Sequence, residues 1–319
     1  MLNRVLPITW YFADAWQFNR GRALLLDRLG HGHFGRVYSA EAVFKGKHGK
    51  TRHQVAVKTV MADAPASAVT DLVHEMEIMK RLGQHPHVVQ LIGCCTDTSP
   101  IFLIMELLKE TLHEYLRRVH SLKYYELPAD HEQRASSQQL LSYGRQVALG
   151  MKYVSGQGII HRDLACRNVL LSEDGVCKIG DFGLSRDVNK EDIYVRQTNM
   201  ALPIRWMAPE SLTVGETSVK SDVWSFGVLL WELSTLGATP YPGKSVDKAR
   251  QMISSGQHME RPTSCLPDLY SVMQQCWRLA PEERADFCAC AARLDQLLEN
   301  NTDYLLLEDV PAEYFADLK

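Results

Sequence analysis

The chain has 319 residues, of which 45% are hydrophobic and 23% are charged, and this ordinary globular composition excludes collagen-like, low-complexity and largely disordered classes. The 35 Lys and Arg residues and 38 Asp and Glu residues give a formal net charge of −3, so the charge favours neither a nucleic-acid partner nor an anionic lipid surface. No run of about 18 apolar residues predicts a membrane-spanning helix.

The cysteines and the first residues bear on the cellular compartment. The eight cysteines include no C-x-x-C pair, and a chain of this length can bury an adequate core without disulfides, so we expect reduced thiols and a cytoplasmic protein. Arg4 followed by an apolar stretch over residues 5–12 weakly resembles a secretory signal, against which Pro7 and the aromatic residues argue. The alternative is a flexible lead-in or a docking strand.

The first third of the chain has the pattern of short strands with one helix among them. Helical spacing of apolar residues predicts a helix over 69–82, because residues 72, 73, 76, 79 and 82 lie on one face. β-Branched and aromatic runs predict strands over 24–29, 36–42, 54–60, 88–94 and 101–106.

The rest of the chain is predicted to be mainly helical. A polar stretch over 120–137 that contains Pro128 and has no periodicity predicts a loop or insert. Strands followed by a helical block indicate an α+β protein with two lobes. Helices are expected over 138–155, 219–235, 246–255, 266–278 and 286–299.

A glycine-rich segment lies between the first two predicted strands. Gly30, Gly32, Gly35 and Val37 form a G-x-G-x-x-G-x-V pattern, which allows backbone N–H groups to approach phosphates. Alone the pattern is a weak signal, because a tight hairpin turn explains it in most cases. A dinucleotide-binding fold requires a helix directly after the glycines, whereas here the sequence continues as a strand.

A lysine and a glutamate form the next candidate pair. Lys58 ends an apolar strand, where its side chain either extends to the surface or binds phosphates. Glu75, on the apolar side of the predicted helix, is the candidate partner of Lys58. The alternatives are a solvated helix face for Glu75 and a competing role for Glu77.

Two further motifs carry oxygen ligands and a proton acceptor. H-R-D-L-A-C-R-N begins at His161 and places Asp163 five residues before Asn168. D-F-G begins at Asp181, after a predicted strand. Carboxylate and amide oxygens together with substrate phosphates are a typical Mg²⁺ ligand set. All these motifs, followed by A-P-E at residues 208–210, occur in a workable order, which makes coincidence improbable.

In these motifs the chain resembles a protein kinase over about residues 16–298. The resemblance implies a two-lobed kinase fold, with five antiparallel strands and one helix in the N-lobe and a mainly helical C-lobe. It also implies ATP and Mg²⁺ as cofactors, with Mn²⁺ as an alternative ion. Expected nucleotide-binding residues are Leu29, Gly30, His31, Gly32, His33, Phe34, Gly35, Val37, Ala56, Lys58, Met105, Glu106, Leu108 and Leu170.

The resemblance also assigns roles in the expected catalytic lobe. Asp163 accepts the substrate hydroxyl proton, Asn168 and Asp181 bind the metal, and Glu75 holds Lys58. Structural roles fall to Asp222, which anchors the catalytic loop, and to a Glu210–Arg284 pair. Catalytic residues are therefore expected at Lys58, Glu75, Asp163, Arg167, Asn168 and Asp181.

The residues around the catalytic aspartate resemble those of tyrosine kinases. Ala165 stands where serine/threonine kinases usually have lysine, and Arg167 supplies the cation instead. Pro203, in the segment before A-P-E, resembles the proline that supports a phenol ring. The segment 71–80 is most similar to the fibroblast, vascular endothelial and platelet-derived growth factor receptors, although Ala285 replaces their usual proline.

The same resemblance implies the domain organisation. Residues 1–22 are expected to be a juxtamembrane-like lead-in, residues 23–298 the kinase domain and residues 299–319 an acidic tail. Within the kinase domain, we expect an N-lobe over 23–106, a hinge over 106–110 and a C-lobe over 111–298. The polar stretch 120–137 is then a short kinase insert. If the chain is a fragment of a receptor, its place is the cytoplasmic face of the plasma membrane.

Regulation is predicted from three tyrosines. Tyr194, between Asp181 and Glu210, is a candidate for autophosphorylation in trans through self-association, or else a substrate-mimicking residue that blocks the site. Tyr304 and Tyr314 are either docking sites for phosphotyrosine-binding adaptors or part of a frayed terminus, which is the favoured reading. Protein substrates that carry tyrosine are expected; the alternatives are a pseudokinase and a serine/threonine or dual-specificity enzyme.

Overall fold

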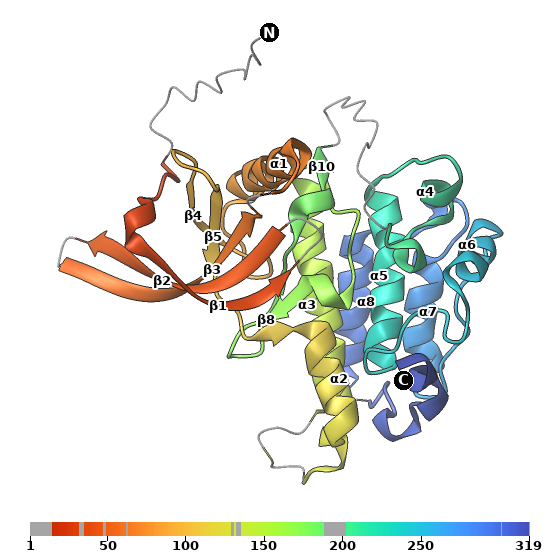
Figure 1. Cartoon of the computed structure of the whole chain (residues 1–319). Helices are drawn as coiled ribbons and strands as arrows, with labels where there is room; N and C mark the ends of the chain where they lie inside the picture. The colour runs from red at the N-terminus through yellow and green to blue at the C-terminus, as the bar shows by residue number, and fades with distance from the viewer. Residues whose placement is uncertain are drawn as a thin grey trace. The chain divides into compact units, whose positions relative to one another are not determined.

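The computed structural model describes residues 15–31, 35–46, 49–61, 63–128, 131, 135–187, 202–300 and 302–318. Most of the signal-like start therefore lies outside the described residues. The chain divides into two compact units, one made of residues 1–69 and 91–107 and the other of residues 70–90 and 108–319. The first unit is built on a sheet and the second mainly on helices (Figure 1).

A five-stranded antiparallel sheet forms the first unit, with the strands in the order β1-β2-β3-β5-β4. One face packs a cluster of small and β-branched side chains that includes Ala40, Val55, Val57 and Ile104, all fully buried. Each strand is found where the sequence predicted one. The bounds are β1 Ala23–His31, β2 Gly35–Gly46, β3 Gly49–Val60, β4 Leu91–Cys95 and β5 Phe102–Glu106.

The lead-in residues cover the edge strand β4. Gln17 forms a parallel bridge with Cys94, whose N–H donates to the carbonyl of Trp16 at 2.8 Å. A short 3₁₀ helix, Arg20–Arg22, follows, and the Arg20 guanidinium lies 4.0 Å from the centre of the Phe102 ring. Pairing an edge strand in this way satisfies backbone groups that would otherwise face solvent.

The helix predicted over 69–82 is α1 (Ala66–Leu82), which begins three residues earlier and crosses into the second unit. Its buried face carries Leu72, Met76, Met79 and Leu82, as the spacing predicted.

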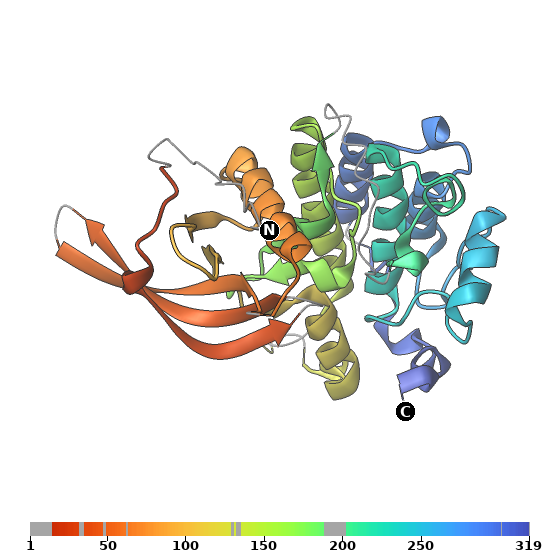
Figure 2. The same ribbon diagram turned by 45° about the horizontal axis from the view of Figure 1, so that its top comes forward.

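The second unit is built around α5, in which nearly every side chain is buried. Helices α3, α5 and α8 run side by side in both views (Figure 1, Figure 2). Five helices were predicted here within two residues of their ends, whereas α2 and α4 were missed. The bounds are α2 Leu112–Leu122, α3 Ser137–Gly156, α4 Pro209–Thr213, α5 Val219–Ser234, α6 Val246–Ser254, α7 Pro267–Cys276 and α8 Phe287–Glu299.

Short strands in the second unit shape the loops that carry the motifs. Strand β8 (Val169–Leu171) lies between β6 (Glu110–Thr111) and β9 (Cys177–Ile179), and all pairs are antiparallel. Strand β7 (Ile159–Ile160) pairs with β10 (Arg186–Asp187). Strand β7 precedes the H-R-D motif and β10 follows D-F-G, while β8 and β9 lie between the two motifs. The two pairings therefore bring the chain segments that flank these motifs together.

Helix α2 corrects the loop predicted over 120–137. It continues to Leu122, and a 3₁₀ turn follows over Tyr124–Glu126, so the irregular part is shorter than predicted. The helix begins at a capping box, in which Thr111 accepts from the N–H of Glu114 and the Glu114 carboxylate accepts from the N–H of Thr111.

The tail is docked rather than frayed, which corrects the favoured reading. Tyr304, Leu305 and Leu307 are at most 7% exposed, and Leu305 forms an antiparallel bridge with Cys265. Further along, the Phe315 ring lies 3.8 Å from the His120 ring of α2, between centroids. The tail docks because its apolar residues 304–307 gain burial against the helical unit.

All eight cysteines are free, and Cys288 at the start of α8 is the one exposed to solvent. Among the described residues, no helix combines the length and apolar character needed to cross a membrane.

Candidate active site

The H-R-D loop leaves β7 and ends in a 3₁₀ turn over Cys166–Asn168, directly before β8. Antiparallel pairing of β8 with β9 places the D-F-G segment alongside it, and the N–H of Gly180 donates to the carbonyl of Asn168 at 2.9 Å. Two non-glycine residues here, Arg162 and Asp181, have left-handed backbone with φ of 69° and 56°. Such conformations are costly and are concentrated at functional sites.

His161 ties these two segments together. Its ring is fully buried, and Nδ1 accepts from the N–H of Asp163 at 3.3 Å. The ring proton is then on Nε2, which donates to the carbonyl of Gly180 at 3.0 Å. The ring also packs against Phe182, with 5.2 Å between centroids. His161 is therefore a fixed structural link between the H-R-D and D-F-G segments.

Asp163 lies next to Arg167, which donates from Nη2 to the carboxylate oxygen Oδ1. Burial raises the pKa of the Asp163 carboxyl, the Arg167 guanidinium opposes this, and Asp181 raises the pKa further. The structure thus brings Asp163, Arg167 and Asp181, three of the expected catalytic residues, close together. A carboxylate with a raised pKa is suited to accepting a proton.

Asn168 completes this group with a defined orientation. It is 7% exposed, and its amide nitrogen donates to the carbonyl of Asp163 at 2.7 Å. This hydrogen bond leaves the amide oxygen as the atom that could face a cation, beside the Asp181 segment. One carboxylate and one amide oxygen fit the sparse protein ligand set of Mg²⁺, which is completed by phosphate oxygens and water. No three His, Cys, Asp or Glu side chains form a closed metal site in the described part of the chain.

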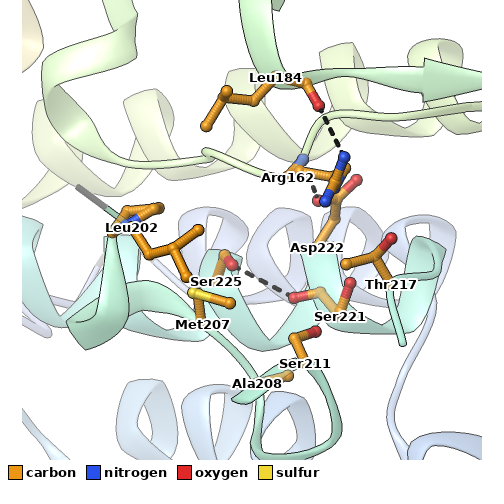
Figure 3. Close-up of a pocket in the computed structure, with 11 residues that line it drawn as sticks. Arg162, Leu184, Leu202, Met207, Ala208, Ser211, Thr217, Ser221, Asp222 and Ser225 are labelled. Carbon is orange, nitrogen blue, oxygen red and sulfur yellow. Dashed lines mark hydrogen bonds between the residues drawn. The ribbon is translucent and has the colours of Figure 1, made fainter. Parts of the chain in front are cut away.

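Asp222, near the start of α5, anchors the loop from below. Its carboxylate is fully buried and accepts from the N–H groups of His161 at 2.7 Å and Arg162 at 2.8 Å. Burial raises the pKa of Asp222, and these hydrogen bonds oppose the shift. Figure 3 shows Asp222 under Arg162, whose guanidinium reaches the carbonyl of Leu184. The adjoining pocket has about 30 Å³ of free space, room for roughly two water molecules.

Glu210 and Arg284, the remaining predicted structural pair, form a bidentate ion pair with N–O distances of 2.7 and 2.8 Å. The pair joins the start of α4 to the loop before α8.

In the first unit, strand register gathers four predicted nucleotide-binding residues on one face of the sheet. Lys58 pairs with Val37, while Ala56 pairs with Met105, so all four side chains point to the same side. This is the face opposite the buried cluster around Val55. Lys58 is half-buried.

The other nucleotide-binding candidates are distributed as follows. Gly30 pairs with Val37 and His31 with Arg36 at the end of the β1–β2 hairpin. Leu29 is 53% exposed, and Glu106 ends β5 opposite Val55. Gly35 begins β2, Leu108 and Leu170 belong to the second unit, and Gly32, His33 and Phe34 lie outside the described residues, as does Tyr194.

Burial distinguishes the two glutamates of α1. Glu75 is 2% exposed, whereas Glu77 is exposed and pairs with Lys80 at 2.8 Å. This observation favours Glu75 over Glu77 as the partner of a functional lysine.

Sequence reasoning missed Glu232, a carboxylate of α5 that is 1% exposed. Burial raises its pKa to about 6. The signal was available, since an acidic residue inside an otherwise apolar helix is rarely buried without a partner.

Most of the chain matches a known protein family. A family profile described as protein tyrosine and serine/threonine kinase matches residues 24–294, most of the chain. The chain belongs to this kinase family. The predicted two-lobed α+β kinase fold is confirmed, with a five-stranded antiparallel sheet in one unit and mainly helices in the other.

The relatives of this kinase domain include receptor tyrosine kinases. It is 44% identical to the tyrosine kinase receptor Cad96Ca of Drosophila melanogaster, over 96% of the chain and 40% of the relative. It is 42% identical to fibroblast growth factor receptor 1 of Xenopus laevis, over 91% of the chain and 37% of the relative. It is 41% identical to fibroblast growth factor receptor 1 of Pleurodeles waltl, over 94% of the chain and 38% of the relative.

The resemblance to receptor-type tyrosine kinases, including the fibroblast growth factor receptors, is thus confirmed. The kinase domain spans about two fifths of the length of these relatives. Membership of the family implies use of ATP with a divalent cation, and protein substrates.

Proposed function

We propose that this kinase domain transfers the γ-phosphate of ATP to tyrosine hydroxyls of proteins. The observation that carries the proposal is the arrangement of Asp163, Arg167 and Asn168 beside Asp181, on a loop whose backbone is held by a buried carboxylate. In this reaction the phenolic oxygen bonds to the γ-phosphorus, the bond from that phosphorus to ADP breaks, and the phenolic proton passes to Asp163.

The remaining residues position the nucleotide. Lys58 contacts the α- and β-phosphates, Glu75 holds Lys58, and the glycine-rich segment covers the phosphates. Asn168 and Asp181 would hold Mg²⁺, or Mn²⁺ in its place, and the bound ion would neutralise charge on the phosphates. Ala56, Val37, Met105 and Leu170, with the segment 106–108, receive the adenine.

Selectivity for tyrosine rests on Arg167. Arg167 follows Asp163 by four residues, whereas the lysine of serine/threonine kinases follows the catalytic aspartate by two. The Arg167 guanidinium binds the Asp163 carboxylate and lies over the Trp206 ring. The substrate segment is thereby held further from Asp163, as the longer reach of a phenol requires. Pro203, whose carbonyl accepts from the N–H of Trp206 at 2.9 Å, supports the phenol ring.

The test is phosphate transfer to poly(Glu,Tyr) compared with a basic serine peptide. We expect transfer to the tyrosine polymer, and a loss of more than about 100-fold in kcat in Asp163→Asn with little change in nucleotide affinity. Asp174→Asn, the same change in the exposed β8–β9 turn, is the matched control and should leave kcat unchanged. Preference for serine, or full activity of Asp163→Asn, would overturn the proposal. Absence of transfer from an intact, nucleotide-bound chain would indicate a pseudokinase.

Regulation by autophosphorylation is part of the proposal. Self-association allows one copy to phosphorylate Tyr194 of another, and the phosphate then pairs with arginines of the activation segment. Phosphate stoichiometry and activity of Tyr194→Phe test this. An unchanged stoichiometry with full activity in that variant would contradict it.

Adaptor binding is proposed at the tail tyrosines. Tyr304 is 5% exposed and its hydroxyl accepts from the Asn300 amide at 3.1 Å, so its phosphorylation requires the tail to leave its docked position. Tyr314 is half-buried, with its ring 5.5 Å from that of Trp231, and is the more accessible of the two. For a receptor fragment, these events take place at the cytoplasmic face of the plasma membrane.

A further inference from the structure

One carboxylate oxygen of Glu232 joins two segments that are far apart in the sequence. Oε2 accepts from the indole Nε1 of Trp206 at 2.9 Å and from the backbone N–H of Cys166 at 3.1 Å. Glu232 is fully buried near the end of α5. Because a buried carboxylate is costly unless its oxygens are bonded, both donors are held tightly in place.

The second link runs from Trp206 to Asp163. The Arg167 guanidinium lies 4.1 Å from the centre of the Trp206 ring, and its Nη2 donates to Asp163. The indole edge is therefore fixed by Glu232 while its face carries the arginine. A cation over an indole is attracted by the negative face of the ring, which adds direction to the contact.

Glu232 fixes the position of Arg167 through two separate contacts. It fixes the backbone of the preceding residue, Cys166, and it fixes the ring on which the guanidinium lies. Asp222, ten residues earlier on α5, holds the beginning of the same loop at His161. A single buried helix thus holds the catalytic loop at both of its ends.

We propose that Glu232 is a positioning residue of the kinase reaction: through Trp206 and Arg167 it sets the orientation of the Asp163 carboxylate toward the substrate hydroxyl. The inference rests on the proposed role of Asp163 as the proton acceptor. Loss of the Arg167 contact removes the side chain whose hydrogen bond holds the Asp163 carboxylate in its orientation.

Three variants test the chain of contacts. Glu232→Ala removes the acceptor, Glu232→Gln retains an amide oxygen, and Trp206→Phe keeps a ring under Arg167 while removing the N–H. We expect kcat for poly(Glu,Tyr) to fall about 10- to 100-fold in Glu232→Ala with the KM for ATP within about twofold, because a small displacement of the reacting group is costly. Glu232→Gln should restore most of the activity.

The matched control is Trp231→Phe, the same substitution one residue before Glu232. The indole N–H of Trp231 has no hydrogen-bond partner in the described structure, so only stability should change. Rates are referred to the folded, nucleotide-binding fraction, measured by titration with a fluorescent ATP analogue. If Glu232→Ala does not fold, Trp206→Phe carries the test and should lower kcat with the KM for ATP within about twofold.

An unchanged kcat per folded molecule in Glu232→Ala or Trp206→Phe, or a loss in Glu232→Gln as large as that in Glu232→Ala, would overturn the inference and leave Glu232 as a stabilising residue only. Failure of the proposed function has a different result, since wild type and Asp163→Asn would then have the same rate.

Discussion

Arg284 and Glu210 form an ion pair in which every guanidinium nitrogen has a partner. Nη1 and Nη2 donate to the two carboxylate oxygens, while Nε donates to the carbonyl of Arg278 at 2.8 Å. The Arg284 side chain is inaccessible to solvent and that of Glu210 is 16% exposed. Such a pair is costly to break on one side, because the remaining charge stays buried.

Arg284→Met should therefore lower the free energy of unfolding by about 3–5 kcal/mol. The matched control is Arg293→Met on α8, whose pairing with Asp268 at 3.7 Å is exposed and should contribute less than about 1 kcal/mol. Urea unfolding followed by circular dichroism measures both. Equal losses in the two variants would show that the Glu210 pair is no more stabilising than a surface contact.

The raised pKa of Glu232 predicts a pH-dependent stability. Burial raises this pKa from 4.5 to about 6, so the folded state binds a proton more tightly than the unfolded chain. The corresponding stabilisation is complete below pH 4.5 and is lost as pH rises through about 6, a change of about 2 kcal/mol. Relative to wild type, Glu232→Gln should gain about that amount between pH 4.5 and 7. The exposed Glu299→Gln controls for the substitution itself; a pH-independent difference at Glu232 would contradict the expectation.

We expect substitution by alanine to have opposite effects on stability at two glycines of α3. A Cβ at Gly150 would lie 2.6 Å from the carbonyl oxygen of His87 and 2.7 Å from Ile179, so Gly150→Ala should destabilise the chain by about 1–3 kcal/mol. Gly156 has nothing within 4 Å, and Gly156→Ala should be neutral or stabilising by up to about 1 kcal/mol. Thermal unfolding distinguishes them, and stabilisation by Gly150→Ala would refute this close approach.

The docked tail predicts different roles for neighbouring leucines. Leu305 is 3% exposed and Leu306 is 38% exposed. Leu305→Ala should cost about 2–5 kcal/mol of unfolding free energy through loss of burial and a residual cavity, whereas Leu306→Ala should change little. A frayed tail would make both substitutions neutral, which chemical denaturation would reveal.

Local patterns explain why much of the fold and site could be predicted. Residue spacing located α1 and the five strands, and the motifs around Asp163 and Asp181 could be recognised because each lies within a few consecutive residues. Helix α2 was missed because polar residues interrupt the pattern of its apolar face. The Thr111–Glu114 capping box is a local signal for the start of this helix.

Partners remote in sequence could not be predicted in the same way. Glu232 meets Cys166 across 66 residues and Trp206 across 26, and only the fold brings these groups together. The tail was misjudged for a related reason: its acidic composition favoured exposure, whereas the apolar run that includes Leu305 finds a surface that no local pattern shows.

The cysteine arrangement has a practical consequence for labelling. Since Cys288 alone among the eight thiols is open to solvent, a maleimide fluorophore added to the folded chain should attach at one position, at the start of α8. The native sequence thus supplies its own spectroscopic handle, far along the chain from the nucleotide-binding strands, without engineered substitutions.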